Sequence, residues 1–167
     1  MKKFLLVLVL FAIIATGTVF ADHSNNKLGI GVMGGWYGGW GTSGWGHAAL
    51  SLKLPSIPIF WGISFGLGEN HFYLGIQGDN YFYEGALVPQ VNLHWFVGLG
   101  AWINVGGFGD NPFLSLGARI PLGLSWHIVD FLEVFLDIAP SLGLQVLPSV
   151  YFPAGGWPLE IGIRLWF

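Results

Sequence analysis

The chain has 167 residues, of which 53% are apolar, 17% aromatic and only 9% charged, and its formal net charge is −3. A soluble domain usually carries about 25% charged residues, so this chain lacks the polar material to coat a water-facing surface. It is too apolar for a disordered chain, and it has no basic patch of the kind that makes nucleic acid a partner. Composition therefore leaves a membrane protein or an aggregating fibre.

Residues 1–21 have the pattern of a secretory signal peptide. Lys2 and Lys3 give a basic start, an apolar run covers 4–14, and Val19 and Ala21 are the small residues of a cleavage site. The run is too short to cross about 30 Å of hydrocarbon as a helix. No cysteine is present, which excludes disulfides, thiol catalysis, thiolate metal sites and lipid attachment at cysteine.

Four strands are predicted in the first half of the remaining chain, at 28–35, 47–54, 59–68 and 71–83. In the third, large apolar side chains alternate with glycine and serine. In the fourth, a polar and aromatic face is made by Tyr73, Gln77, Asp79, Tyr81 and Tyr83. Asn80 falls on the opposite, apolar face, which suggests a position near a membrane interface.

Four further runs, at 90–105, 114–126, 132–146 and 159–167, alternate with a period of two. In the first of them every odd position is apolar, and most even positions are small or polar. A helix would spread those polar groups around its circumference, whereas a strand places them on one face. The runs match the about 9–11 residues of a tilted membrane-spanning strand and exceed the about 5–6 of a soluble one.

Because lipid cannot hydrogen-bond an open edge, a spanning sheet must close on itself. The sequence therefore predicts an all-β fold: a closed antiparallel transmembrane β-barrel of about eight strands over 22–167, after a cleaved signal peptide over 1–21. An even strand number places both ends of the barrel chain on the periplasmic side. Segments 55–58, 84–89 and 127–131 are then predicted as periplasmic turns, and 36–46, 69–70, 106–112 and 147–157 as external loops.

The first of these external loops is rich in glycine and aromatic residues. Its candidate binding residues are Trp36, Tyr37, Trp40 and Trp45. One interpretation is that the rings anchor the barrel at the membrane interface. The other is a stacking platform for an external ligand, whose identity stays open.

The predicted strand faces place the charged side chains of the strands on one side of the sheet. Seven side chains are expected in the lumen and none on the lipid face: Lys53, Asp79, Arg119, Glu133, Asp137, Glu160 and Arg164. If a turn places Trp126 opposite Asp130, Arg119 lies opposite Asp137. Such a network is either a structural plug that satisfies buried charges or a gate on an ion path. Inward rings would fill much of an eight-stranded interior: Phe60, Tyr73, Phe96, Trp102, Phe135 and Trp166.

Three stretches carry a family resemblance: Gly117–Leu124, Phe135–Pro140 and Glu160–Phe167. They resemble an uncharacterised family of small spirochaete outer-membrane barrels, within the broader OmpA/OmpX-like class. The last stretch is similar to the C-terminal signal that barrel-assembly machinery reads, with Phe167 as its terminal aromatic. The resemblance implies a barrel rather than an activity. Pro121 departs from sheet rules because it cannot donate to the ladder, and we predict a local bulge there.

Chemical signatures are sparse. None of the five histidines pairs with a serine on a lipid face or with another histidine at metal-ligand spacing, so we expect no catalytic residue, no metal site and no cofactor. The glycine-rich segment lacks the features of a phosphate loop. The expected location is the bacterial outer membrane, with membrane lipid and the barrel-assembly machinery as partners.

Three hypotheses for function follow. The first is a barrel with a structural or surface-interaction role and a largely plugged lumen. The second is a narrow channel for ions or small apolar solutes. The third, a lipid-modifying enzyme of the outer membrane, has the least support in the sequence, and the protein is expected not to be an enzyme.

Overall fold

The computed structural model describes residues 26–39, 45–68, 71–108 and 111–167. The predicted signal peptide and Trp40 lie outside these residues. The strands are β1 (Gly29–Gly39), β2 (Trp45–Lys53), β3 (Phe60–Gly68), β4 (His71–Val88), β5 (Leu93–Phe108), β6 (Asn111–Arg119), β7 (Leu122–Val129), β8 (Leu132–Ile138), β9 (Ser141–Leu147) and β10 (Tyr151–Trp166). One 3₁₀ turn, η1 (Pro89–Val91), joins β4 to β5. Within the described ranges, no helix is long and apolar enough to span a membrane.

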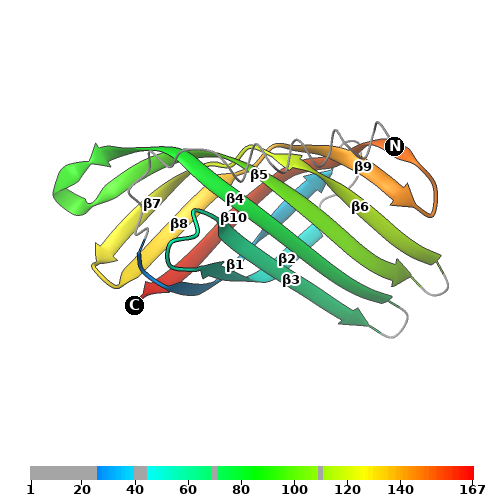
Figure 1. Cartoon of the computed structure of the whole chain (residues 1–167), viewed down its shortest axis with the longest axis horizontal. Helices are drawn as coiled ribbons and strands as arrows, with labels where there is room; N and C mark the ends of the chain where they lie inside the picture. The colour runs from blue at the N-terminus through cyan, green and yellow to red at the C-terminus, as the bar shows by residue number, and fades with distance from the viewer. Residues whose placement is uncertain (1–25, 40–44, 69–70, 109–110) are drawn as a thin grey trace.

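The sheet closes on itself, because β1 pairs with β2 on one side and with β10 on the other. Every pairing is antiparallel, and the long tilted strands run side by side along the molecule (Figure 1). β5 pairs with both β6 and β7, and β10 pairs with both β9 and β8. The ten segments therefore follow eight paths around the ring, which confirms the predicted closed β-barrel of about eight strands.

Two prolines explain why eight paths contain ten segments. Pro121 separates β6 from β7, and Pro140 separates β8 from β9. Proline has no N–H to donate to a ladder, so each strand is interrupted at that point. The sheet stays connected across the gap, because the Ile120 N–H donates to the Pro140 carbonyl over 3.0 Å and the Gly98 N–H donates to the Pro121 carbonyl over 2.8 Å. The bulge predicted at Pro121 is thus a strand break.

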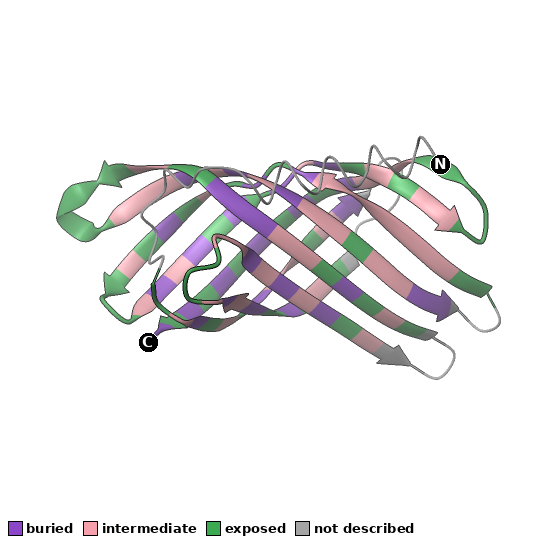
Figure 2. Ribbon diagram, viewed as in Figure 1, coloured by how far each residue is buried: buried purple, intermediate pink, exposed green. Residues whose placement is uncertain are grey.

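The strand faces are apolar outside and polar or small inside. On β10 the outward residues Leu159, Ile161 and Ile163 are 46–56% exposed, while the inward Glu160 and Arg164 are at most 2% exposed. The same alternation gives the checkered burial pattern along the strands in Figure 2. A soluble protein has the reverse arrangement, with charged groups facing water and apolar groups inside.

Several predicted connections are wrong because the strands extend further than the apolar alternation. β1 runs to Gly39 and β2 starts at Trp45, so all of the described part of the predicted loop 36–46 is strand. β4 continues to Val88, and β5 and β6 together cover all described residues of 106–112. β10 starts at Tyr151, inside the predicted loop 147–157. Backbone pairing can continue beyond an apolar belt, where outward side chains need not be apolar.

A bulge in β4 corrects one predicted face. The pairing with β5 shifts between Tyr81 and Tyr83, and one inserted residue moves the side chains that follow to the opposite face. Tyr81 is accordingly buried in the barrel, whereas Tyr83, predicted to share its face, is 49% exposed. Asn80, just before the bulge, is buried.

Candidate functional site

The barrel interior has two parts. Leu28 and Phe167 exchange backbone hydrogen bonds at one end of the barrel, which we name the terminal end. Strands β3, β5 and β9 end, and β4, β6 and β10 begin, at the other, the hairpin end (Figure 1). Charged and aromatic side chains fill the terminal part and the middle, and a cavity occupies the hairpin end.

The seven charged residues predicted for the lumen all lie there, and none is more than 4% exposed. We call them the charged plug: Lys53, Asp79, Arg119, Glu133, Asp137, Glu160 and Arg164. They come from β2, β4, β6, β8 and β10, so they join walls that are distant along the chain. Burying an ion is costly unless it is paired, so their contacts decide whether the interior is stable.

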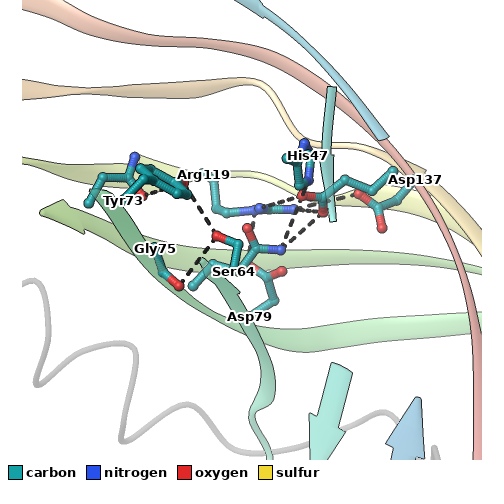
Figure 3. A network of polar contacts seen from close by, with 10 residues as sticks. His47, Ser64, Tyr73, Gly75, Asp79, Arg119 and Asp137 are labelled. Carbon is teal, nitrogen blue, oxygen red and sulfur yellow. Dashed lines mark hydrogen bonds and ion pairs between the residues drawn. The ribbon is translucent and has the colours of Figure 1, made fainter. Parts of the chain in front are cut away.

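Arg119 is the centre of the first cluster. Its Nη2 lies 2.6 Å from Glu160 Oε2 and its Nη1 lies 3.4 Å from Glu160 Oε1, a two-pronged contact. Its Nε is 3.2 Å from Asp79 Oδ1, although not aligned for a hydrogen bond, and its Nη2 is 3.6 Å from Asp137 Oδ1. One guanidinium thus contacts carboxylates from three other strands (Figure 3).

Glu160 has further partners besides Arg119. Gln77 Nε2 donates to both of its oxygens over 3.2 and 3.1 Å, and His47 Nε2 lies 3.2 Å from Oε1. In the β8–β10 ladder Glu160 faces Asp137 directly. Two like charges in facing positions repel each other, so the shared Arg119 is what makes this pair tolerable.

The register that brings Arg119 near Asp137 differs from the prediction. Trp126 pairs with Val134 rather than with Asp130, and Asp137 pairs with Gly123. The backbone partner of Arg119 is Ser141, on β9. Arg119 reaches Asp137 because its long side chain extends across the interior, so the predicted contact is found in a different register.

Arg164 is the centre of the second cluster, nearer the terminal end. Its Nη1 donates to Glu133 Oε2 over 2.7 Å, and its Nε and Nη2 donate to Ser51 Oγ over 3.2 and 3.0 Å. The Glu133 carboxylate also accepts from Ser125 Oγ at 2.8 Å and from Trp166 Nε1 at 3.0 Å. This ion pair is therefore hydrogen-bonded on both sides.

Aromatic rings fill the space around Arg164. The guanidinium lies 4.6 Å from the Phe60 ring centroid and 4.5 Å from that of Phe135, within cation–π distance of both. Phe60 stacks on Tyr81 at 4.2 Å, and Tyr81 stacks on Phe96 at 4.1 Å. Lys53 donates to the Leu54 carbonyl at 3.0 Å and lies over the Phe60 ring. Rings and paired charges together fill this part of the lumen.

The hairpin end is open instead, with a cavity of about 950 Å³. Its aromatic lining consists of Tyr37, Phe65, Tyr73, Trp102, Phe113 and Tyr151. Hydroxyl and amide side chains lie between the rings: Ser64 Oγ donates to the Tyr73 hydroxyl at 3.3 Å, which donates to Asn104 Oδ1 at 3.1 Å. A smaller pocket at the floor, of about 50 Å³, touches Arg119 and Glu160 of the charged plug.

Trp102 reaches the cavity wall across two glycines. It faces Gly117 on β6, which faces Gly143 on β9. A Cβ at Gly143 would lie 2.7 Å from Cζ2 of the indole, so only glycine leaves room for the ring here. The Trp102 indole nitrogen is buried and has no hydrogen-bond partner in the described part of the chain.

The predicted external loop residues are distributed differently. Tyr37 lies in β1 and lines the cavity, and Trp36, its neighbour in β1, is 54% exposed. Trp45 is the first residue of β2. Phe167, the predicted assembly signal, is exposed beyond the end of β10.

The sequence pattern did not reveal the cavity, nor the neutral side chains that contact the charged plug. His47, Ser51, Gln77 and Ser125 all contact plug charges, and the signal that could have found them is that they share the inward strand face. Among the described residues, no group of three His, Cys, Asp or Glu side chains could hold a metal ion.

Comparison with known proteins supports the fold. The structure is similar to the crystal structure of Neisserial surface protein A (NspA), with a TM-score of 0.54 over 84% of this chain and 96% of that chain. The two sequences are 11% identical, so the likeness concerns the fold alone. No curated protein matches the chain.

A family model does match the sequence. It covers residues 44–164, from the β1–β2 connection almost to the end of β10. The match includes all seven residues of the charged plug and most of the cavity lining. The chain therefore belongs to the family described as Protein of unknown function (DUF3996).

Proposed function

We propose that the protein is an integral barrel of the bacterial outer membrane that conducts neither ions nor solutes and has a structural or surface-interaction role. The membrane location is supported by the outward apolar faces of a closed sheet, which suit lipid and not water. On this proposal residues 1–21 are removed on export and Phe167 is read by the barrel-assembly machinery. The relation to OmpA/OmpX-like barrels is part of the proposal and is supported by the eight-path ring. The relation to spirochaete barrels, also part of the proposal, is supported by the resemblance of Gly117–Leu124, Phe135–Pro140 and Glu160–Phe167.

The charged plug is the observation that best supports a closed lumen. Its seven side chains from five strand segments are at most 4% exposed, and all but Lys53 pair with one another rather than line a water column. Lys53 donates to the Leu54 carbonyl instead. The stacked rings of Phe60, Tyr81 and Phe96 add a second obstruction. A channel would have to break several short ion pairs before a path existed.

Conductance tests this proposal. The chain from residue 22 onward is refolded into lipid vesicles, and the folded fraction is counted by the gel-mobility shift on boiling. Planar-bilayer recordings and sugar-dependent vesicle swelling are then expected to show no large, long-lived pore. Stable conductance from folded barrel would contradict the proposal and favour the narrow channel instead.

The proposal assigns no catalytic role. The His47–Glu160 contact resembles part of an acid–base pair, but the Glu160 carboxylate is already held by Arg119 and Gln77. In an orientation with both chain termini on the periplasmic side, the hairpin end and its cavity open toward the cell exterior.

A further inference from the structure

We propose that the hairpin-end cavity is a binding site for a neutral saccharide. This goes beyond the proposed function and does not depend on whether the barrel conducts. Its size of about 950 Å³ is at the upper end of the range of about 300–1,000 Å³ found for ligand pockets. The plug closes its floor, so a ligand enters and leaves by the hairpin end.

The charge of the lining argues against an ionic ligand. None of the described residues that line the cavity is Asp, Glu, Lys or Arg, and the lining residue His47 contacts Glu160 over 3.2 Å. Arg119 and Glu160, at the floor, are committed to each other over 2.6 Å. A carboxylate, phosphate or ammonium ligand would lose its hydration without gaining an opposite charge, which is unfavourable.

The polar groups of the lining argue against a purely apolar ligand. Ser64, Asn104, Asn111, Ser115 and Gln145 all contribute hydroxyl or amide side chains. An apolar solute would remove water from these groups and leave them without compensating hydrogen bonds.

The aromatic side chains of the lining provide apolar surfaces on which a sugar ring can stack. Tyr37, Tyr73, Trp102, Phe113 and Tyr151 come from five different strands and surround the cavity. Tyr73 and Phe113 lie nearly parallel, with centroids 6.3 Å apart and an interplanar angle of 20°. A pyranose ring has an apolar C–H face that stacks on such rings and a rim of hydroxyls that bonds amides, so a lining of both kinds fits it.

The site is itself fixed in shape. Ser64, Tyr73 and Asn104 are joined in one hydrogen-bonded series, and Figure 3 shows Ser64 and Tyr73 beside the Arg119 cluster. Gly143 clears the space that the Trp102 indole occupies. Because these side chains are already held in place by contacts within the protein, they lose less conformational entropy when a ligand binds.

Saturation-transfer NMR on the folded barrel in lipid nanodiscs tests the proposal. The probes are maltotriose, cellotriose and tri-N-acetylchitotriose, with trigalacturonate as the size-matched anion. At least one neutral trisaccharide is expected to bind at millimolar concentration or below, and more tightly than trigalacturonate. Absence of binding by all three neutral probes, or tighter binding of the anion, would overturn the proposal.

Matched variants place the binding in the cavity. Ser115→Ala removes a hydroxyl of the cavity lining, and a net hydrogen bond corresponds to a loss of roughly 2- to 12-fold in affinity. Gln145→Leu is expected to weaken binding likewise. The controls Ile103→Val and Leu144→Val change the adjacent outward side chains and are expected to leave affinity unchanged. Equal affinity in all four variants would show that the saccharide binds elsewhere and would refute the site.

The same sugar chemistry is offered by a free oligosaccharide and by the headgroup of a glycolipid. Competition of the bound trisaccharide by dodecyl maltoside and by maltose separates them. Stronger displacement by the detergent indicates a lipid-anchored sugar, and equal displacement indicates a free one. Failure of both to compete with a bound maltotriose would contradict a shared saccharide site.

Discussion

The Arg119–Glu160 contact offers the sharpest test of how the lumen is held together. Replacing Arg119 with Met removes the guanidinium that touches Asp79, Asp137 and Glu160, the nearest of them at 2.6 Å. Three buried carboxylates then lose the cation that they share, and Glu160 keeps its contacts with Gln77 and His47. Breaking a buried pair in this way typically costs about 3–5 kcal/mol, and we expect a loss of that size in the free energy of unfolding.

Replacing Glu160 with Leu is expected to cost less. Arg119 keeps Asp79 and Asp137, and the change removes the facing repulsion between Glu160 and Asp137. The main loss is the charged hydrogen bonds to Arg119, worth about 1.5–3 kcal/mol. In the double variant both charges of the contact are absent, so its loss should fall short of the sum of the single losses by about 1.5–3 kcal/mol.

The measurement is a double-mutant cycle from reversible urea unfolding in lipid vesicles, followed by tryptophan fluorescence. A control cycle combines Arg119→Met with Glu133→Leu, because Glu133 is bonded to Arg164 and not to Arg119. The control coupling is expected to stay within about 0.5 kcal/mol. Strict additivity in the Arg119/Glu160 cycle, or equal coupling in both, would refute this account of the plug.

Three further outcomes follow from the same structure. Leu136→Lys, on the outward face, is expected to destabilise the barrel in lipid vesicles by about 2–4 kcal/mol, and a harmless effect there would mean that this face does not contact lipid. Deleting Phe167 is expected to reduce the heat-modifiable fraction in cells but not after refolding in detergent, and an equal loss in both would indicate a folding role instead. Gly162→Ala places a Cβ against the Phe135 ring, and we expect a loss of about 1–3 kcal/mol in urea unfolding, whereas no change would show that the ring moves freely.

The sequence was sufficient for the fold because alternation is local. Along 159–167, apolar residues at every second position fix which side of the strand faces out, and Glu160 and Arg164 then share the inward face. The inward position of charges on other strands follows by the same parity. The strand number follows from counting such runs.

Contacts between distant strands could not be predicted in the same way. His47 and Glu160 are 113 residues apart in the chain, and no local pattern specifies which inward side chains meet. The bulge after Tyr81 changes the facing of Tyr83, although both positions continue one alternating run in the sequence. The cavity depends on how much of the lumen remains after all side chains are placed, which is a property of the closed barrel.

The placement of charge on β10 has a consequence for the order of assembly. The main partner of Arg119 is Glu160 and that of Glu133 is Arg164, and both partners belong to the last strand of the chain. Until this strand docks between β1 and β8, Glu133 lacks its cation and Arg119 lacks its closest carboxylate. Final docking therefore joins the two edges of the sheet and completes both ion pairs in the same step.

The spacing of these two charges also disfavours one misalignment. In the native ladder Arg164 faces Glu133, and Glu160 lies next to Arg119. Sliding β10 by four residues to set Glu160 opposite Glu133 would separate Glu133 from Arg164 and leave Arg119 without its closest partner. Both short ion pairs would be lost in that register, so electrostatics favours the native alignment over it before the barrel is sealed.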